Sequence, residues 1–127
     1  MPNQRINPEG MVKPTGYTYA VKSGKTVYVS GQVAQDAGGN VVGKGNAGQQ
    51  AEQVFKNLEL CLKAAGGSMK DIVKITSYLT TADDIPAFRQ VRVKYLADGH
   101  MGSTLVVVSR LASPDFIVEV EAIAVLE

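Results

Sequence analysis

The chain has 127 residues, of which 45% are hydrophobic and 20% are charged, and its formal net charge is +1. A domain of this size can bury a core of its own, and it gains stability from oligomerisation. The balanced charge argues against a protein that binds duplex nucleic acid or a membrane surface, so we expect neither partner.

The N-terminal residues and the cysteine content indicate the cellular compartment in which the protein works. The N-terminal stretch shows no apolar core of a signal peptide, and no apolar run approaches the roughly 20 residues of a membrane span. The single cysteine, Cys61, cannot form an intrachain disulfide, which suits a reducing environment. We expect a cytoplasmic protein in which Cys61 is a buried and inert thiol.

The first half of the chain predicts two strands and one long helix. Residues 1–16 are rich in Pro, Asn and Gly, and we expect a mobile or edge-packed leading segment. β-Rich runs at 17–22 and 26–30, joined by a Ser-Gly-Lys turn, predict a hairpin. Asn46 is a suitable N-cap for a helix that reaches Ala65, because apolar residues recur at steps of three and four and two glycines follow.

The second half predicts a strand at 72–80, a helix capped by Asp83 or Asp84, a strand at 104–111 and a final strand at 117–125. The order β-β-α-β-α-β-β favours an α+β sandwich, in which a mixed sheet carries both helices on one face. The opposite face also needs a cover. Because only two helices are available, we expect a second copy of the chain to provide it.

The final strand places two carboxylates within an apolar run. Alternation predicts one wholly apolar face and a second face that carries Ile117, Glu119, Glu121, Ile123 and Val125. Two interpretations stay open: glutamates that meet water or a lysine, or a carboxylate in a semi-apolar pocket that acts as an acid or base. Desolvation and the neighbouring like charge both favour the neutral form of Glu119.

Motifs for metals and cofactors are missing from the sequence. The single histidine, His100, and the single cysteine cannot form a zinc site by spacing, and we expect His100 on the surface. The glycines at 38–39 and 43–45 lack the strand–loop–helix spacing of a phosphate-binding loop. We therefore expect no metal and no cofactor.

Several segments together resemble the reactive intermediate deaminase family, known as RidA/YjgF or endoribonuclease L-PSP-like. The resemblance covers almost the whole chain, as a single domain over residues 1–127. Its segments are Gly16-Tyr17, Val29-Ser30-Gly31-Gln32, Ala64-Ala65-Gly66-Gly67, Asp71-Ile72-Val73-Lys74 and Val118-Glu119-Val120-Glu121-Ala122-Ile123-Ala124.

This resemblance implies a chorismate-mutase-like homotrimer, with sheets facing inward, helices outside and small-molecule clefts between the subunits. The implied activity is hydrolysis of reactive enamines and imines to 2-keto acids and ammonia, without a cofactor. A second activity reported for the family, as an endoribonuclease and translation inhibitor, is disfavoured here. Ribonucleases usually need an acid–base pair and phosphate-facing cations, which the spacing does not show.

Carried over position by position, Tyr17, Ser30 and Gly31 fall at positions that bind substrate in the cleft. Glu119 falls at the carboxylate that positions and deprotonates the attacking water. By the same resemblance Glu121 is left as a structural residue, expected to pair with a cation such as Lys74.

Three further cleft positions depart from the family pattern. Ser103 stands where deaminating members have an arginine that clamps the substrate carboxylate, Leu105 replaces a cysteine, and Arg89 replaces an asparagine. A serine cannot replace the fixed fork of a guanidinium, so activity on 2-imino acids is doubtful. The chain resembles branches that lack this arginine; Arg89, Arg92 or Arg110 could supply the charge, with Arg89 the best placed.

Two functions therefore remain in competition. One is a hydrolase of an imine, enamine or related C–N bond through a water activated by Glu119. The other is a trimeric protein that binds a small metabolite at the clefts without chemistry.

Overall fold

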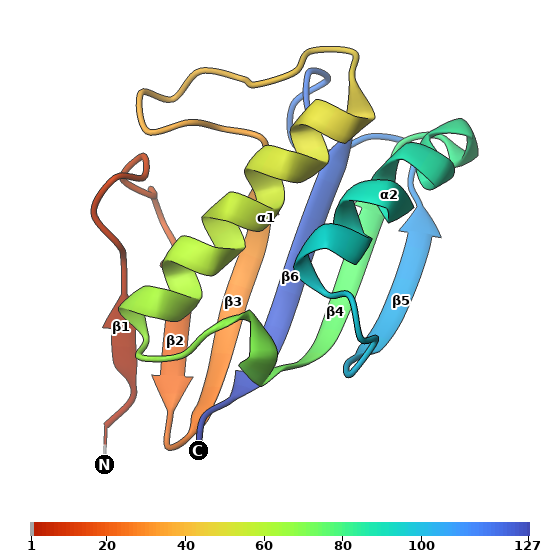
Figure 1. Cartoon of the computed structure of the whole chain (residues 1–127). Helices are drawn as coiled ribbons and strands as arrows, with labels where there is room; N and C mark the ends of the chain where they lie inside the picture. The colour runs from red at the N-terminus through yellow and green to blue at the C-terminus, as the bar shows by residue number, and fades with distance from the viewer. Residues whose placement is uncertain (1) are drawn as a thin grey trace.

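Two helices lie side by side across one face of a six-stranded sheet in the computed structural model of the chain, which describes residues 2–127 (Figure 1). The strand order is β1-β2-β3-β6-β4-β5, and only β4 and β5 run parallel. The elements are β1 Gln4–Ile6, β2 Ala20–Ser23, β3 Thr26–Val33, α1 Ala47–Ala64, β4 Ile72–Leu79, α2 Ile85–Tyr95, β5 Gly102–Val107 and β6 Val118–Val125. The predicted α+β class, with a mixed sheet and both helices on one face, is confirmed.

The sheet gains one strand that the sequence pattern did not predict. Residues 4–6 of the leading segment pair antiparallel with residues 20–22 at the edge of the sheet. The segment is thus packed on an edge, one of the two expected possibilities. Its three residues are too few and too polar to show an alternating pattern.

The predicted strand at 104–111 is wrong at its end. β5 pairs with β4 only as far as Val107, opposite Leu79, where β4 itself ends. Beyond that point Arg110 donates from Nε to the Leu111 carbonyl oxygen at 3.0 Å and from Nη2 to that of Ala112 at 3.1 Å. β-Propensity continues past Val107, but no neighbouring strand remains to pair with it.

The long helix forms as its sequence pattern predicts. The Asn46 side chain accepts a hydrogen bond from the backbone N–H of Gln49 at 3.0 Å, which satisfies a free donor of the first turn. At the other end Gly66 takes a φ of +90°, a left-handed conformation that ends helices and suits glycine. The apolar stripe of α1 packs against the sheet, and Cys61 is fully buried within it, as expected.

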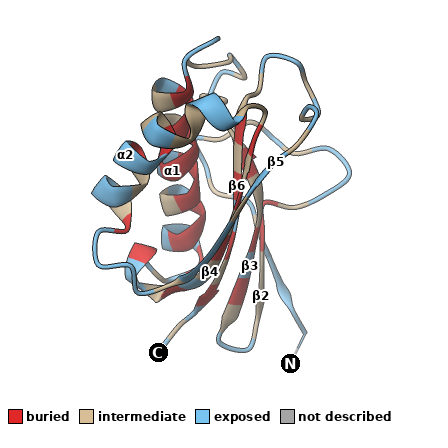
Figure 2. Cartoon of the chain, turned by 90° about the vertical axis from the view of Figure 1, so that its right-hand side faces the viewer, coloured by how far each residue is buried: buried red, intermediate tan, exposed pale blue. Residues whose placement is uncertain are grey.

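The two faces of the sheet differ sharply (Figure 2). On β6 the side chains of Val118, Val120, Ala122 and Ala124 are buried beneath the helices. The alternate residues of β6, from Glu119 to Val125, lie on the other face, which has no second layer of elements within the described chain. We call this second surface the open face.

Candidate functional site

Glu119 lies near the middle of the open face. Its neighbours in the strand register are Val33 on β3 and Tyr78 on β4. The side chain is half-buried, and burial raises the pKa of its carboxyl group, with the negative charge of Glu121 as the second cause. The direction agrees with the expectation from the strand pattern, and it moves the carboxyl toward a useful range for proton transfer.

A bulge in β3 makes room for this carboxylate. Val29 pairs with Ala122 and Gln32 with Val120, so two residues of β3, Ser30 and Gly31, face one residue of β6. A Cβ atom placed on Gly31 would lie 2.1 Å from the Oε2 atom of Glu119. The absence of a side chain at position 31 is therefore what allows the observed position of Glu119.

The bulge is held by hydrogen bonds on both sides. The Ser30 hydroxyl donates to the Thr18 carbonyl oxygen at 2.7 Å, and the Gln32 side chain donates to the Ser30 carbonyl oxygen at 3.0 Å. Gln32 itself is buried. Ser30 therefore acts on the shape of the site through the backbone, in addition to its place beside Gly31.

Tyr17 lies next to this region on the segment before β2. Its side chain is 56% exposed, and its ring meets that of Tyr19 edge to face with 5.9 Å between centroids. Tyr17 and Gly31 line one small cavity together with residues of the leading segment, of β3, of the loop after β3 and of α1. An exposed aromatic ring beside a cavity is available to contact a ligand.

Ser103, Leu105 and Arg89 lie on the other side of the sheet. Ser103 pairs with Ile75 and Leu105 with Ser77, two residues that are buried beneath the helices. Leu105 packs against the core, whereas Ser103 is exposed at the edge.

Arg89 is exposed on α2, in the helical layer above that same face. One chain thus divides the predicted site residues into two groups on opposite faces. Ser30, Gly31 and Glu119 form one group, with Tyr17 beside Gly31 at a shared cavity, and Arg89, Ser103 and Leu105 form the other.

The expected pairing of Glu121 with Lys74 is wrong. The Tyr78 phenol donates a hydrogen bond to Glu121 instead, and this bond is the main cause that raises the pKa of Tyr78, followed by burial. Lys74 donates to the Thr104 hydroxyl at 2.7 Å and to the Ile75 carbonyl oxygen at 3.2 Å. Sequence reasoning missed Tyr78, although its position in the alternating run at 72–80 assigns it to the open face.

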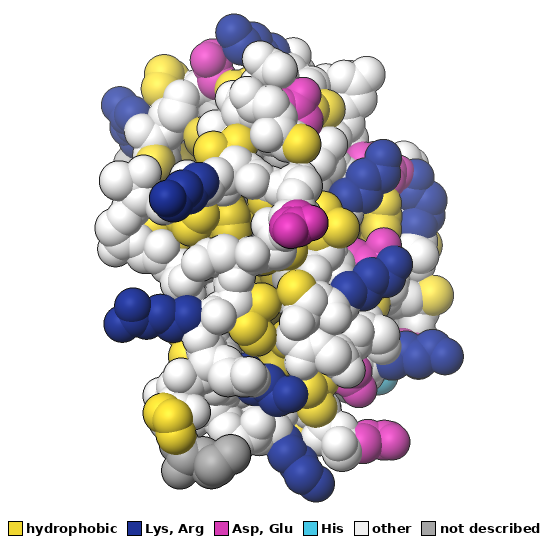
Figure 3. All heavy atoms as spheres, turned by 90° about the vertical axis from the view of Figure 1, so that its left-hand side faces the viewer, with side chains coloured by type: hydrophobic (Ala, Val, Ile, Leu, Met, Phe, Trp, Pro, Cys, Tyr) yellow, Lys and Arg dark blue, Asp and Glu magenta, His cyan; other side chains and the backbone are white. Residues whose placement is uncertain are grey.

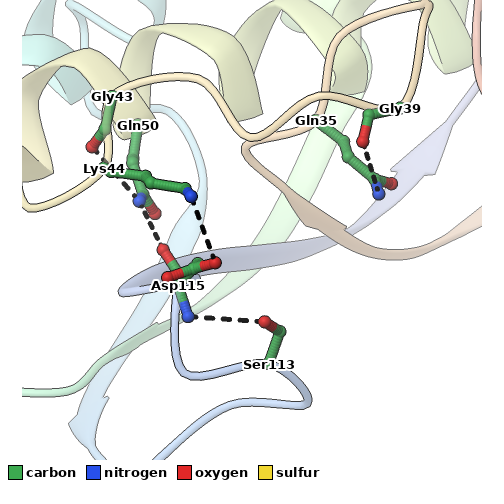
Figure 4. Close-up of polar contacts among 7 residues, drawn as sticks. All are labelled: Gln35, Gly39, Gly43, Lys44, Gln50, Ser113 and Asp115. Carbon is green, nitrogen blue, oxygen red and sulfur yellow. Dashed lines mark hydrogen bonds and ion pairs between the residues drawn. The ribbon is translucent and has the colours of Figure 1, made fainter.

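A buried glutamine fixes the start of β6 (Figure 4). The Gln50 side chain donates to the carbonyl oxygen of Asp115 at 2.8 Å and to that of Gly43 at 3.3 Å. It also accepts from the backbone N–H of Ile117 at 2.9 Å. Gln50 is fully buried on α1, so these bonds join the helix to the strand that carries Glu119. A glutamine on the apolar stripe of a helix was the only sequence signal for this link.

The remaining reactive side chains show no arrangement for chemistry in the described chain. Burial raises the pKa of the Cys61 thiol to about 12, which keeps the sulfur protonated and unreactive. His100 is a surface residue that contacts Asp98, as its loop position predicted. Residues 2–127 contain no cluster of three or more metal-ligating side chains, and none of their helices is long and apolar enough to cross a membrane.

Charge on the β1 side of the molecule is scattered. Figure 3 shows lysine and arginine side chains separated by neutral and acidic ones, without merging into a continuous basic surface. The absence of nucleic acid among the binding partners stays a prediction, drawn from the charge balance.

Comparison with known proteins gives a consistent set of relatives. The family model described as Endoribonuclease L-PSP matches residues 10–126. The chain is 34% identical to the 3-aminoacrylate deaminase RutC of Acinetobacter baylyi, over 98% of both proteins. It is 32% identical to a 2-iminobutanoate/2-iminopropanoate deaminase of Dermatophagoides farinae, over 91% of this chain and 90% of that one. The crystal structure of RidA from an Antarctic Psychrobacter bacterium is similar at a TM-score of 0.89 and 34% identity, covering 97% of this chain and 99% of that one.

Proposed function

This chain belongs to the RidA/YjgF family, also called endoribonuclease L-PSP, and we propose that it hydrolyses a reactive imine, enamine or related C–N compound. The observation that carries the proposal is Glu119: a half-buried carboxylate with a raised pKa, on an open sheet face, fitted against a glycine. The family includes imine and enamine deaminases, which makes C–N hydrolysis the reaction class to consider first.

The chemistry follows from a base held beside a bound imine carbon. Glu119 takes a proton from water, and the water oxygen bonds to the carbon of the C=N group. The same carboxyl returns this proton to the nitrogen, which gives a carbinolamine. It then carries the hydroxyl proton to the nitrogen, the C–N bond breaks, and ammonia leaves while a carbonyl group remains. An enamine enters this sequence after a proton is added to its carbon, which gives the imine.

We propose that the reaction takes place in clefts between the subunits of a homotrimer. The division of the site residues into two groups on opposite faces supports this, because neighbouring copies can bring one group against the other. The open face also exposes large side chains: Tyr28 is 50% exposed, Val125 43% and Val106 38%. A single layer of sheet with such a surface is typical of a protein that associates.

The second group of residues, which the proposed trimer brings to the cleft, indicates the class of substrate. Ser103 offers a hydroxyl group and Leu105 an apolar surface, neither of which can pair with a carboxylate. Arg89 is exposed and makes no ion pair within residues 2–127. These residues favour a substrate that lacks the carboxylate of a 2-imino acid, or one whose carboxylate reaches Arg89.

The second candidate function is a binding protein that holds a small metabolite without chemistry. Ser103 and Leu105 favour it, because a clamp for an anionic substrate is missing from their positions. The raised pKa of Glu119 favours the hydrolase, because an ordinary binding site gains nothing from a carboxylate that is poised to move a proton.

A coupled assay separates these two functions. Imines and enamines are generated in situ from several amino acids and amines, and the release of ammonia is followed with and without this protein. A family member that carries the arginine serves as the positive control. We expect faster hydrolysis of at least one neutral substrate. No acceleration on any of them, together with ligand binding to the trimer, would leave the binding protein as the better account.

A further inference from the structure

Glu119 and Glu121 are like carboxylates on one strand face, but their surroundings differ. Two steps along a strand separate them by about 7 Å, near enough for their charges to interact. Glu121 is exposed and accepts the hydrogen bond of the Tyr78 phenol. Glu119 is half-buried, and burial and then the charge of Glu121 raise the pKa of its carboxyl group.

Two close carboxylates compete for the first proton that either takes up. Unless their environments differ, they share that proton and neither has a single role. A hydrogen bond donated to one of them stabilises its charged form, and burial of the other stabilises its neutral form. Different environments for paired carboxylates are what assign separate acid and base roles in enzymes.

The residues of β3 and the cation of β4 do not make the surroundings of Glu119 differ from those of Glu121. From β3 it faces Gly31 and Val33, which carry no charge, and Tyr28 lies farther along the same strand. The cation of β4, Lys74, is engaged with Thr104 on the far side of that strand.

Arg5 lies on β1, with β2 and β3 between it and β6. Besides burial, Tyr78 is thus the group that treats the two carboxylates differently, through its hydrogen bond to Glu121. The hydrogen bond to Glu121 and burial both raise the pKa of this phenol, so it keeps its proton and remains a donor.

We propose that Tyr78 assigns the roles of the two glutamates, because its hydrogen bond engages Glu121 and leaves Glu119 as the carboxyl that takes up and releases the proton. The use of that proton in hydrolysis rests on the proposed function. The assignment itself concerns the protein without substrate. Tyr78 is therefore a positioning residue that acts on Glu119 through Glu121.

Carboxyl titration by NMR tests the assignment directly. The protein is labelled with ¹³C-glutamate, and the carboxyl shifts of both glutamates are followed against pH in the wild type, Tyr78→Phe and Tyr28→Phe. Tyr28→Phe is the matched control, because Tyr28 lies on the same open face, opposite Ile123, and makes no hydrogen bond through its phenol within residues 2–127. A two-dimensional amide spectrum of each variant checks the fold.

In the wild type we expect the midpoint of Glu119 to be raised, because its carboxyl group is half-buried beside Glu121. Tyr78→Phe should draw the two midpoints together and broaden both curves, while Tyr28→Phe should leave them unchanged. Glu121→Gln is the second variant, and it should lower the Glu119 midpoint by roughly 0.5 to 1.5 pH units, from unit charges about 7 Å apart. This variant tests the inference even where Tyr78→Phe does not fold.

Unchanged midpoints in Tyr78→Phe would overturn the inference, as would a Glu119 midpoint that Glu121→Gln leaves unchanged. Neither result needs a substrate. A protein that turns over no imine but shows the expected titrations contradicts the proposed function alone. One that turns over imines with wild-type titrations in Tyr78→Phe contradicts the role of Tyr78 alone.

Discussion

The fit of Glu119 against Gly31 gives the sharpest prediction about the site. In Gly31→Ala the new Cβ atom would stand 2.1 Å from Oε2 and 2.9 Å from the carboxyl carbon of Glu119. Ordinary contact begins at 3.4 Å, so the oxygen must move by about 1.3 Å. The carboxylate is the free end of a flexible side chain, and its displacement costs roughly 0.5–1.5 kcal/mol through a strained rotamer.

A shift of this size affects catalysis more than stability. Misplacement of a catalytic group by about 1 Å lowers the rate by roughly 100-fold. We therefore expect Gly31→Ala to fold, to lose about 1 kcal/mol of unfolding free energy in urea, and to lose about two orders of magnitude in kcat/KM.

The matched control for Gly31→Ala is Gly48→Ala. Gly48 lies within α1, where an added Cβ would stand an ordinary 3.5 Å from the Oδ1 atom of Asn46. That alanine should raise the helix stability by roughly 0.5–1 kcal/mol and leave turnover unchanged. Wild-type kcat/KM in Gly31→Ala would refute the argument that this glycine makes room for a working carboxylate.

The remaining predictions concern the substrate, the assembly and the pH dependence of stability. Because the family resemblance places Ser103 at the position of a bidentate arginine clamp, we expect 2-imino acids to be turned over roughly 30- to 5000-fold less efficiently than by an arginine-bearing relative, and equal kcat/KM values would contradict this. Light scattering at micromolar concentration should give three times the 13.5 kDa chain mass, and a monomer would remove the interfacial cleft. Burial raises the pKa of Glu119 above its ordinary value of 4.5 in the folded chain. In the pH range between the unfolded and the folded pKa, the folded state therefore holds a proton that the unfolded state has lost. The contribution of Glu119 to stability should therefore decline as pH rises through this range, and urea titrations of Glu119→Gln should show a flatter pH dependence than the wild type.

Strand alternation was enough to predict the open face and the position of Glu119 on it. The period of two assigns each residue of β6 to a face regardless of what lies beside the strand. The neighbours of Glu119 could not be predicted in this way, because they depend on strand register and on the bulge at Ser30 and Gly31. The wrong partner for Glu121 has the same cause: Lys74 and Tyr78 share a face, and only the three-dimensional geometry shows which of them reaches it.

The second group of residues shows another limit of sequence reasoning. β5 is an edge strand, and five of its six residues are exposed, so its composition does not reveal which face is which. Only the pairing of Ser103 with Ile75 and of Leu105 with Ser77 places these two residues on the helix side. A resemblance that names cleft residues along the chain does not say that one subunit brings them together.

The effect of Glu119→Gln on turnover tests the central claim most directly. The change keeps the size and shape of the side chain but removes the base, and Glu59→Gln on α1 serves as the matched control. On any imine or enamine that the wild type hydrolyses, we predict that kcat falls by roughly 10²–10⁴ in Glu119→Gln, with the fold and the assembly retained, and stays unchanged in Glu59→Gln. An unchanged kcat in Glu119→Gln would contradict the assignment of this carboxylate as the base that activates water.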